Sequence, residues 1–161
     1  MMPPIISVVG KSGSGKTTLI EKLIPELRRR GYKIGIVKHA FHNFDMDKKG
    51  KDSWRHKAAG AETVVVASPG RIGMIKDHDS EDLESFEIYF RDMDIVITEG
   101  YKRQNKPKIE IFRAVAHDAP LCLDDNSLIA FVTDTGIDMN IPRFGLDDIE
   151  GLADLVEKKF L

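Results

Sequence analysis

The stretch GKSGSGKT at residues 10–17 constrains this chain more than any other. It matches the pattern G-x-x-x-x-G-K-[ST] at every specified position, between an apolar run and an amphipathic segment. Its glycines allow a tight turn whose N–H groups face phosphate oxygens, and the N-terminus of the following helix faces the same anion. The sequence therefore predicts a nucleotide-binding P-loop between a strand and a helix.

Side chains in and near this loop suggest how a nucleotide and Mg²⁺ would be held. Lys16 supplies a positive charge at the outer phosphates, and the Thr17 hydroxyl suits the oxygen shell of Mg²⁺. The run DIVITEG places Glu99 at the end of an apolar strand, where it would orient the metal through water. Gly100 then lets the chain turn away close to the phosphates. Thr17 and Glu99 are the predicted metal residues.

A base-recognition residue is suggested by VTD at the end of a later apolar run. The Asp134 carboxylate is placed to accept hydrogen bonds from guanine N1–H and the 2-amino group, both of which adenine lacks. An aspartate that merely ends a strand is an equally good interpretation. The residues predicted to bind the nucleotide are Gly10, Lys11, Ser12, Gly13, Ser14, Gly15, Lys16, Thr17, Thr18, Gly100 and Asp134.

The order of the apolar segments predicts an α/β protein. Strands are expected at 5–9, 33–39, 62–67, 71–76, 94–100, 108–112 and 128–134, and helices at 16–31, 52–61, 78–93 and 146–161. Alternating strands and helices favour a mostly parallel central sheet. We therefore expect one three-layer domain over residues 1–161, with the P-loop NTPase fold.

Several local details are also predicted. Pro25 lies inside the first helical pattern and should kink or loosen it. Asp52 or Ser53 is expected to cap the second helix. Residues 108–112, KIEIF, alternate as an edge or half-buried strand does, so their exposed edge is a candidate for pairing between subunits.

Charge and composition narrow the class of partner. Residues 1–60 contain 13 basic and 5 acidic residues, which suits a polyanionic ligand near the glycine loop. No basic and aromatic interleaving points to nucleic acid. No apolar run is long enough to span a bilayer, so no membrane association is expected. Cys122 is the only cysteine, which is typical of a reducing, cytoplasmic setting.

The polar stretch after the second strand holds further candidates. Asp47 and Asp52 resemble the acids of a switch-type loop, in which one carboxylate positions the attacking water or contacts Mg²⁺; both are catalytic candidates, as is Lys16. His39 and His42 with a nearby aspartate would form a metal site, although the spacing fits no known zinc pattern. Two histidines in a phosphate-facing loop more often contact anions or solvent.

Taken together, these motifs resemble the molybdopterin-guanine dinucleotide biosynthesis protein B family, MobB. The resemblance rests on GKSGSGKTTLIEKLIPEL, VKHAFHNFDMDKKGKDSWRHKAAGA, DIVITEGYK and PKIEIFR. It implies a P-loop fold, a homodimer, GTP and Mg²⁺ as ligands, and a weak GTPase. It further implies that the protein assists a partner enzyme, MobA, which attaches GMP to molybdopterin. Molybdopterin itself is a further candidate ligand.

Two other functions use the same loop. A small-molecule kinase would need a mobile arginine-bearing lid, and no arginine-rich segment around Arg71, Arg91 or Arg103 stands out. A nucleotide-gated carrier of a metal or cofactor would hold its cargo at the loop containing His39 and His42. Lys11, a second lysine in the loop, would reach across a dimer in one P-loop subclass but is more simply an exposed lysine.

Overall fold

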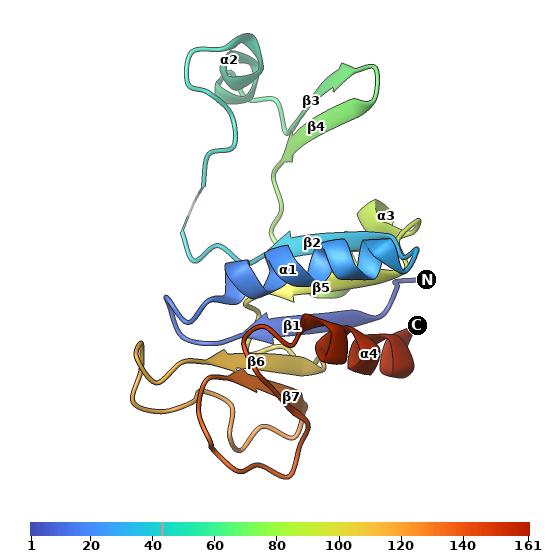
Figure 1. Ribbon diagram of the computed structural model, residues 1–161. Helices are drawn as coiled ribbons and strands as arrows, with labels where there is room; N and C mark the ends of the chain where they lie inside the picture. The colour runs from blue at the N-terminus through green and yellow to red at the C-terminus, as the bar shows by residue number, and fades with distance from the viewer. Residues whose placement is uncertain (43) are drawn as a thin grey trace. The chain divides into compact units, whose positions relative to one another are not determined.

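The computed structural model describes residues 1–42 and 44–161. The chain forms two compact units, residues 1–39 with 86–161 and residues 40–85 (Figure 1). The organisation as one domain stays a prediction. Each unit is described by itself.

The first unit is built on a six-stranded sheet in which every neighbouring pair of strands is parallel. Its order is β2 (Ile34–Lys38), β5 (Ile95–Glu99), β1 (Ile5–Val9), β6 (Lys108–Phe112), β7 (Leu128–Thr133) and β8 (Arg143–Phe144). Because the strands are parallel, their carboxyl ends share one edge of the sheet (Figure 1). The chain leaving β1 is therefore flanked by the ends of β5 and β6.

Two helices, α1 (Lys16–Arg29) and α4 (Ile149–Phe160), cover one face of this sheet (Figure 1). Their apolar stripes pack on β1, β5, β6 and β7 in one cluster of buried side chains. Helix α1 is continuous through Pro25, although proline removes one hydrogen bond of the helix. Its buried leucines and isoleucine keep the helix on the sheet on both sides of that residue.

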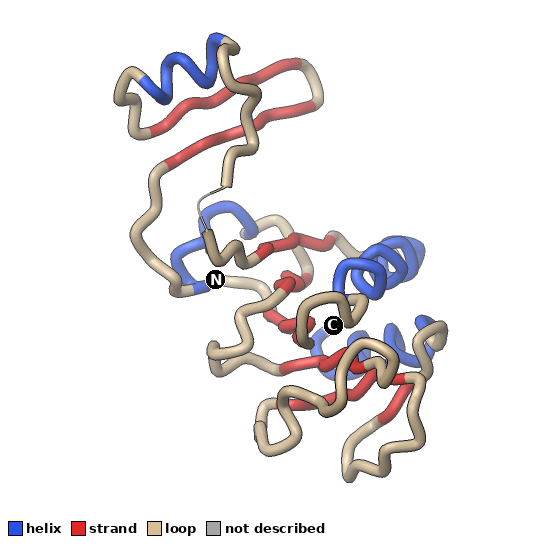
Figure 2. The backbone as a smooth tube through the Cα atoms, turned by 90° about the vertical axis from the view of Figure 1, so that its left-hand side faces the viewer, coloured by secondary structure: helices blue, strands red, loops and turns tan. Residues whose placement is uncertain are grey.

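The opposite face is covered differently. Helix α3 (Glu87–Phe90) follows the 3-10 turn η1 (Leu83–Phe86), and Phe90 packs so closely on Gly35 of β2 that a Cβ there would clash with its ring. Long loops connect β5 to β6, β6 to β7 and β7 to β8 (tan in Figure 2). The α/β P-loop fold expected from the sequence is confirmed, with short helical structure in place of the longer helix that the sequence predicts over 78–93.

Strand β6 is central, so the prediction of an edge or half-buried strand is wrong. It pairs with β1 on one side and β7 on the other, and all five residues are buried. Lys108 Nζ donates to Gln104 O at 2.8 Å and Ser127 Oγ at 2.6 Å, and lies 3.0 Å from Asp125 Oδ2. With these partners the ammonium is buried without being orphaned. β6 therefore offers no free edge for pairing between subunits.

Glu110 of β6 is buried in the same way. Its two carboxylate oxygens accept the backbone N–H groups of Leu121 and Cys122, from the loop that crosses this face. Burial raises the pKa of the carboxyl, and these two hydrogen bonds oppose the rise. The alternating polar residues of KIEIF thus bind loops and do not face solvent.

The N-termini of two helices differ in how they are capped. Helix α2 (Asp52–Ala58) has Lys51 at its N-cap and no capping side chain, so neither Asp52 nor Ser53 is the cap. Asp52 lies in the first turn, where its charge favours the helix N-terminus. In α4, Asp148 is the N-cap and accepts a hydrogen bond from Gly151 N at 3.1 Å.

The second unit contains α2 and an antiparallel hairpin, β3 (Thr63–Ser68) with β4 (Arg71–Lys76). The strands expected at 62–67 and 71–76 are confirmed, and they form this hairpin. Lys57 of α2 pairs with Asp77 at 2.8 Å. Among residues 1–42 and 44–161, no helix has the length and apolar character needed to cross a membrane.

Candidate functional site at the nucleotide loop

The loop after β1 lies tightly against β6. Gly10 has a φ of 150°, and a Cβ at this position would come within 2.5 Å of the Ile111 carbonyl oxygen and 2.6 Å of Ser14 Oγ. Gly15 has a φ of 101° and precedes α1, whose first turn is closed by Leu19 N donating to Gly15 O at 2.9 Å. Glycine is required at the first of these positions by both conformation and space.

Lys16 folds back over the loop. Its Nζ donates to the carbonyl oxygens of Gly10 and Lys11, both at 2.9 Å. Partial burial lowers the pKa of Lys16 below its ordinary value; nearby Glu99 opposes this shift, and the charges of Lys38 and Lys102 add to it. An anion bound in the loop would favour the charged ammonium, so the site is electrostatically suited to phosphate.

Thr17 and Glu99 meet at the start of α1. Thr17 Oγ1 donates to Glu99 Oε1 at 2.8 Å, although the residues are 82 positions apart in sequence. Lys38, at the end of β2, places its Nζ 3.6 Å from the same carboxylate oxygen. The strand order brings this about, because β5 lies between β1 and β2 and ends with Glu99 paired to Val8 and Lys38.

The turn after β5 holds the carboxylate end of this site. His39 N donates to Glu99 O and Gly100 N donates to Val8 O, each at 3.0 Å, so the backbone ladder continues past the strand. Gly100 has a φ of 97°, and Tyr101, with a φ of 57°, is the one non-glycine residue with positive φ in the described chain. The rings of His39 and Tyr101 lie 4.8 Å apart.

Ser14 is the most buried polar residue of the loop. It is 1% exposed, its N donates to Lys11 O at 3.2 Å, and its Oγ has no hydrogen-bond partner among the described atoms. Lys11, Ser12, Gly13 and Thr18 belong to the same loop and first helical turn, as predicted. The structure thus gathers the predicted residues 10–18, Glu99 and Gly100 at one edge of the sheet.

Asp134 follows β7 at this edge, two strands away from β1. Its Oδ1 accepts Ala114 N at 3.2 Å, and its Oδ2 lies 4.0 Å from Arg113 Nε. The carboxylate therefore fastens the segment after β6 to the end of β7. Recognition of guanine by Asp134 stays a prediction.

Asp47 and Asp52 belong to the second unit, and their catalytic roles stay predictions. Asp47 Oδ1 accepts Lys48 N at 2.8 Å, and Asp47 Oδ2 is buried with no hydrogen-bond partner among described atoms. Within the described chain, no group of three or more His, Cys, Asp or Glu side chains is arranged to hold a metal ion. His39 belongs to the first unit and His42 to the second, so a metal site that joins them stays untested.

Three side chains near the loop are absent from the predicted set. Lys38 contacts Glu99, Arg113 lies beside Gly15, and His117 Nε2 is 2.6 Å from Ser12 O. Each comes from or follows the carboxyl end of a strand in the parallel sheet. Their location at strand ends is the one feature of the sequence that could have predicted these three residues. Using it requires knowledge of the strand order.

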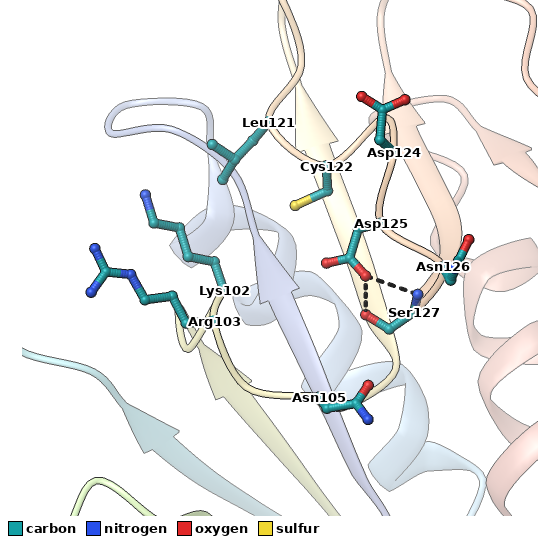
Figure 3. A pocket seen from close by; sticks show the side chains of 9 residues that line it. All are labelled: Lys102, Arg103, Asn105, Leu121, Cys122, Asp124, Asp125, Asn126 and Ser127. Atoms are coloured by element: carbon teal, nitrogen blue, oxygen red, sulfur yellow. Dashed lines mark hydrogen bonds between the residues drawn. The ribbon is translucent and has the colours of Figure 1, made fainter.

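A hollow of about 600 Å³ lies on the loop-covered side of the first unit. Figure 3 shows Lys102, Arg103 and Asn105 from the loop after β5, with Leu121, Cys122 and residues 124–127 also lining the hollow. Hydrogen bonds from the Ser127 hydroxyl and backbone lower the pKa of Asp125 to about 2, which keeps it charged beneath Lys108. Burial raises the pKa of the Cys122 thiol to about 11, so this cysteine is not an activated nucleophile.

A family model and relatives of similar length place this chain in one family. The family model described as MobB, molybdopterin guanine dinucleotide synthesis protein B, matches residues 5–134. A molybdopterin-guanine dinucleotide biosynthesis adapter protein of Escherichia coli is 36% identical over 163 residues, covering 96% of this chain and 92% of the relative. A protein of the same name from Haemophilus influenzae is 36% identical, and the match covers 96% of this chain and 88% of the relative.

Solved structures show the same likeness. The crystal structure of Bacillus subtilis MobB has a TM-score of 0.80 to this chain, with 28% sequence identity. It covers 98% of both chains. The likeness therefore extends over nearly the whole length of both chains.

Proposed function

This chain belongs to the MobB family, and we propose that it is a GTP-binding adapter in the synthesis of the guanine dinucleotide form of the molybdenum cofactor. In this role it assists a MobA-type enzyme as that enzyme attaches GMP to molybdopterin. The proposal includes a homodimer and slow hydrolysis of GTP, with Asp47 or Asp52 placing the water. The relatives of nearly equal length support the adapter role.

The observation that carries the proposal is the position of the Lys16 ammonium inside the nucleotide loop. Lys16 Nζ is held inside the loop by two carbonyl oxygens, which are weak substitutes for phosphate oxygens. At Gly10 the backbone packs so closely on Ile111 that no side chain fits between them. A triphosphate would accept the Lys16 hydrogen bonds and the N–H groups at the start of α1.

The residues also fit Mg²⁺ beside such a triphosphate. Thr17 Oγ1 and Glu99 Oε1 lie 2.8 Å apart and provide the hard oxygen atoms that Mg²⁺ prefers. Thr17 would hold the ion directly, and Glu99 would hold one of its waters. The ion would neutralise charge on the outer phosphates, while Lys16 binds and orients them.

Calorimetric titration with a nonhydrolysable GTP analogue and the matching ATP analogue tests this function. In the presence of Mg²⁺ we expect the guanine analogue to bind at least about tenfold more tightly, a difference of about 1.4 kcal/mol. The full-length wild-type chain is used. Equal affinity for the two analogues, or a preference for adenine, would contradict the GTP-binding role and favour a kinase.

Changing Glu99 to Gln separates the metal from the nucleotide. Glutamine keeps an oxygen that accepts the Thr17 hydrogen bond but removes the charge, so we expect the affinity for GTP with Mg²⁺ to fall about tenfold. In EDTA the affinity should stay equal or rise, because a negative charge near the phosphates is gone. Calorimetry in both conditions measures the two effects.

Asp94→Asn is the matched control for that change. Asp94 immediately precedes β5, at the opposite end of the strand from Glu99 and the nucleotide loop. Its Oδ2 accepts a hydrogen bond from Lys33 N at 2.7 Å. Its substitution should leave the effect of Mg²⁺ on GTP affinity unchanged. A similar loss for Glu99→Gln with and without Mg²⁺ would show that Glu99 supports the loop and not the ion.

A further inference from the structure

His117 reaches the nucleotide loop from outside it. Its Nε2 lies 2.6 Å from the carbonyl oxygen of Ser12, a residue 105 positions away in sequence. The histidine is half-buried, on the loop between β6 and β7. Neither the P-loop pattern nor the candidate metal residues account for this contact.

The strand order explains how the histidine arrives there. β6 is paired with β1 in parallel, with Val9 opposite Glu110, so the segments that follow the two strands run beside each other. The backbone N–H groups of Ala116 and His117 both donate to Arg113 O, at 3.0 and 3.2 Å, which closes a turn directly after β6. The turn is short, and its backbone hydrogen bonds fix where the ring can lie.

A second anchor fastens this turn to the next strand. Ala114 N donates to Asp134 Oδ1 at 3.2 Å, and Asp134 immediately follows β7. Arg113 lies beside the loop: a Cβ built on Gly15 would be 3.9 Å from the Arg113 Cδ. The residues from Arg113 to His117 are therefore held between the ends of two strands and against the loop.

The chemistry of the contact fixes the proton on the ring. A carbonyl oxygen only accepts hydrogen bonds, so Nε2 of His117 must carry hydrogen, in the neutral tautomer or the imidazolium. A trans peptide points its C=O and N–H in opposite directions. Holding the Ser12 carbonyl therefore turns the N–H of Gly13 away from the histidine ring.

We propose that His117 is a positioning residue of the nucleotide loop, which orients the Ser12–Gly13 peptide for contact with phosphate. The proposal rests on the proposed function, because it takes the loop to bind a nucleoside triphosphate. Gly13 has a φ of 75° and no neighbouring atom within 4 Å of an added Cβ, so no side chain packs against this residue. Ser14 N donates to Lys11 O at 3.2 Å and closes a turn around the Ser12–Gly13 peptide. The hydrogen bond from His117 adds a contact with the peptide itself and selects its orientation within that turn.

Three substitutions at His117 test the role of Nε2. In His117→Gln the amide nitrogen falls near the position of Nε2 and can donate to the Ser12 carbonyl oxygen. In His117→Asn the side chain is shorter, so its amide nitrogen falls near the position of Nδ1 and does not reach that oxygen. We expect GTP with Mg²⁺ to bind about tenfold more weakly to His117→Leu and His117→Asn, as is typical for one lost hydrogen bond. Binding to His117→Gln should stay within about twofold of wild type.

A second measurement distinguishes positioning from general stability. In the nucleotide-free protein, Ser14 N donates to Lys11 O and closes the turn around the Ser12–Gly13 peptide. Amide hydrogen exchange at Ser14 should be faster in His117→Leu and His117→Asn, with little change at core amides of β1. The thermal midpoint of unfolding is recorded for each variant. Weaker binding in His117→Leu that His117→Gln does not restore, or unchanged binding in all three, would overturn the proposal.

The outcome for wild-type protein separates this proposal from the proposed function. If wild-type protein binds GTP and His117→Leu binds it equally well, only the positioning role fails. If wild-type protein does not bind GTP with Mg²⁺ at all, the proposed function fails, and the exchange data at Ser14 still decide whether His117 holds the loop.

Discussion

Replacing Lys16 with Ala is expected to lower the affinity for GTP by at least about 100-fold, or about 3 kcal/mol, because charge-assisted hydrogen bonds to phosphate would be lost. Lys16 Nζ is the cation held inside the loop, at 2.9 Å from two loop carbonyl oxygens. In the substituted protein those oxygens lose a donor but stay near solvent, so the midpoint of thermal unfolding should change by only a few degrees.

The control for this result lies on the same helix. Lys22 forms an exposed ion pair with Asp147 at 2.6 Å. Exposed pairs of this kind contribute little to stability, so Lys22→Ala should keep both the affinity for GTP and the unfolding midpoint. Calorimetry of the two variants gives the comparison. GTP affinity in Lys16→Ala within threefold of wild type would remove Lys16 from the phosphate site.

Most of the loop and its two metal candidates can be predicted from sequence because each lies next to its own signal. The spacing of the glycines and Lys16 predicts the nucleotide loop. The apolar strand that ends in Glu99 and Gly100 predicts the carboxylate that accompanies the loop. The loop and this strand end depend on local patterns, which a single sequence records directly. The contact between Thr17 and Glu99 also requires β5 to lie beside β1.

The parts that escape prediction depend on strand order and on burial of polar residues. The alternation of Lys108 and Glu110 with isoleucines in KIEIF predicts an edge strand, whereas both residues are buried with hydrogen-bond partners from loops. Nothing local indicates that those partners exist. His117 escapes prediction for the same reason, since its contact with Ser12 spans 105 positions and requires β6 beside β1.

Replacing Gly10 with Ala is expected to lower the free energy of unfolding by about 3 kcal/mol and to weaken GTP binding strongly. At a φ of 150° the alanine backbone is strained, and its Cβ would meet the buried Ile111 carbonyl oxygen at 2.5 Å. That atom belongs to β6, which is paired on both sides and cannot move freely. The loop itself must shift, and the phosphate-facing amides shift with it.

Gly13→Ala is the matched control, because it changes the same loop without a steric conflict. Its φ of 75° also disfavours alanine, but no atom lies within 4 Å of the added Cβ. We expect a loss of only about 1 kcal/mol from backbone strain. Urea denaturation of the two variants measures the difference, which isolates the contact with Ile111. Equal losses would mean that conformation alone, and not the close approach of β6, requires glycine at the start of the loop.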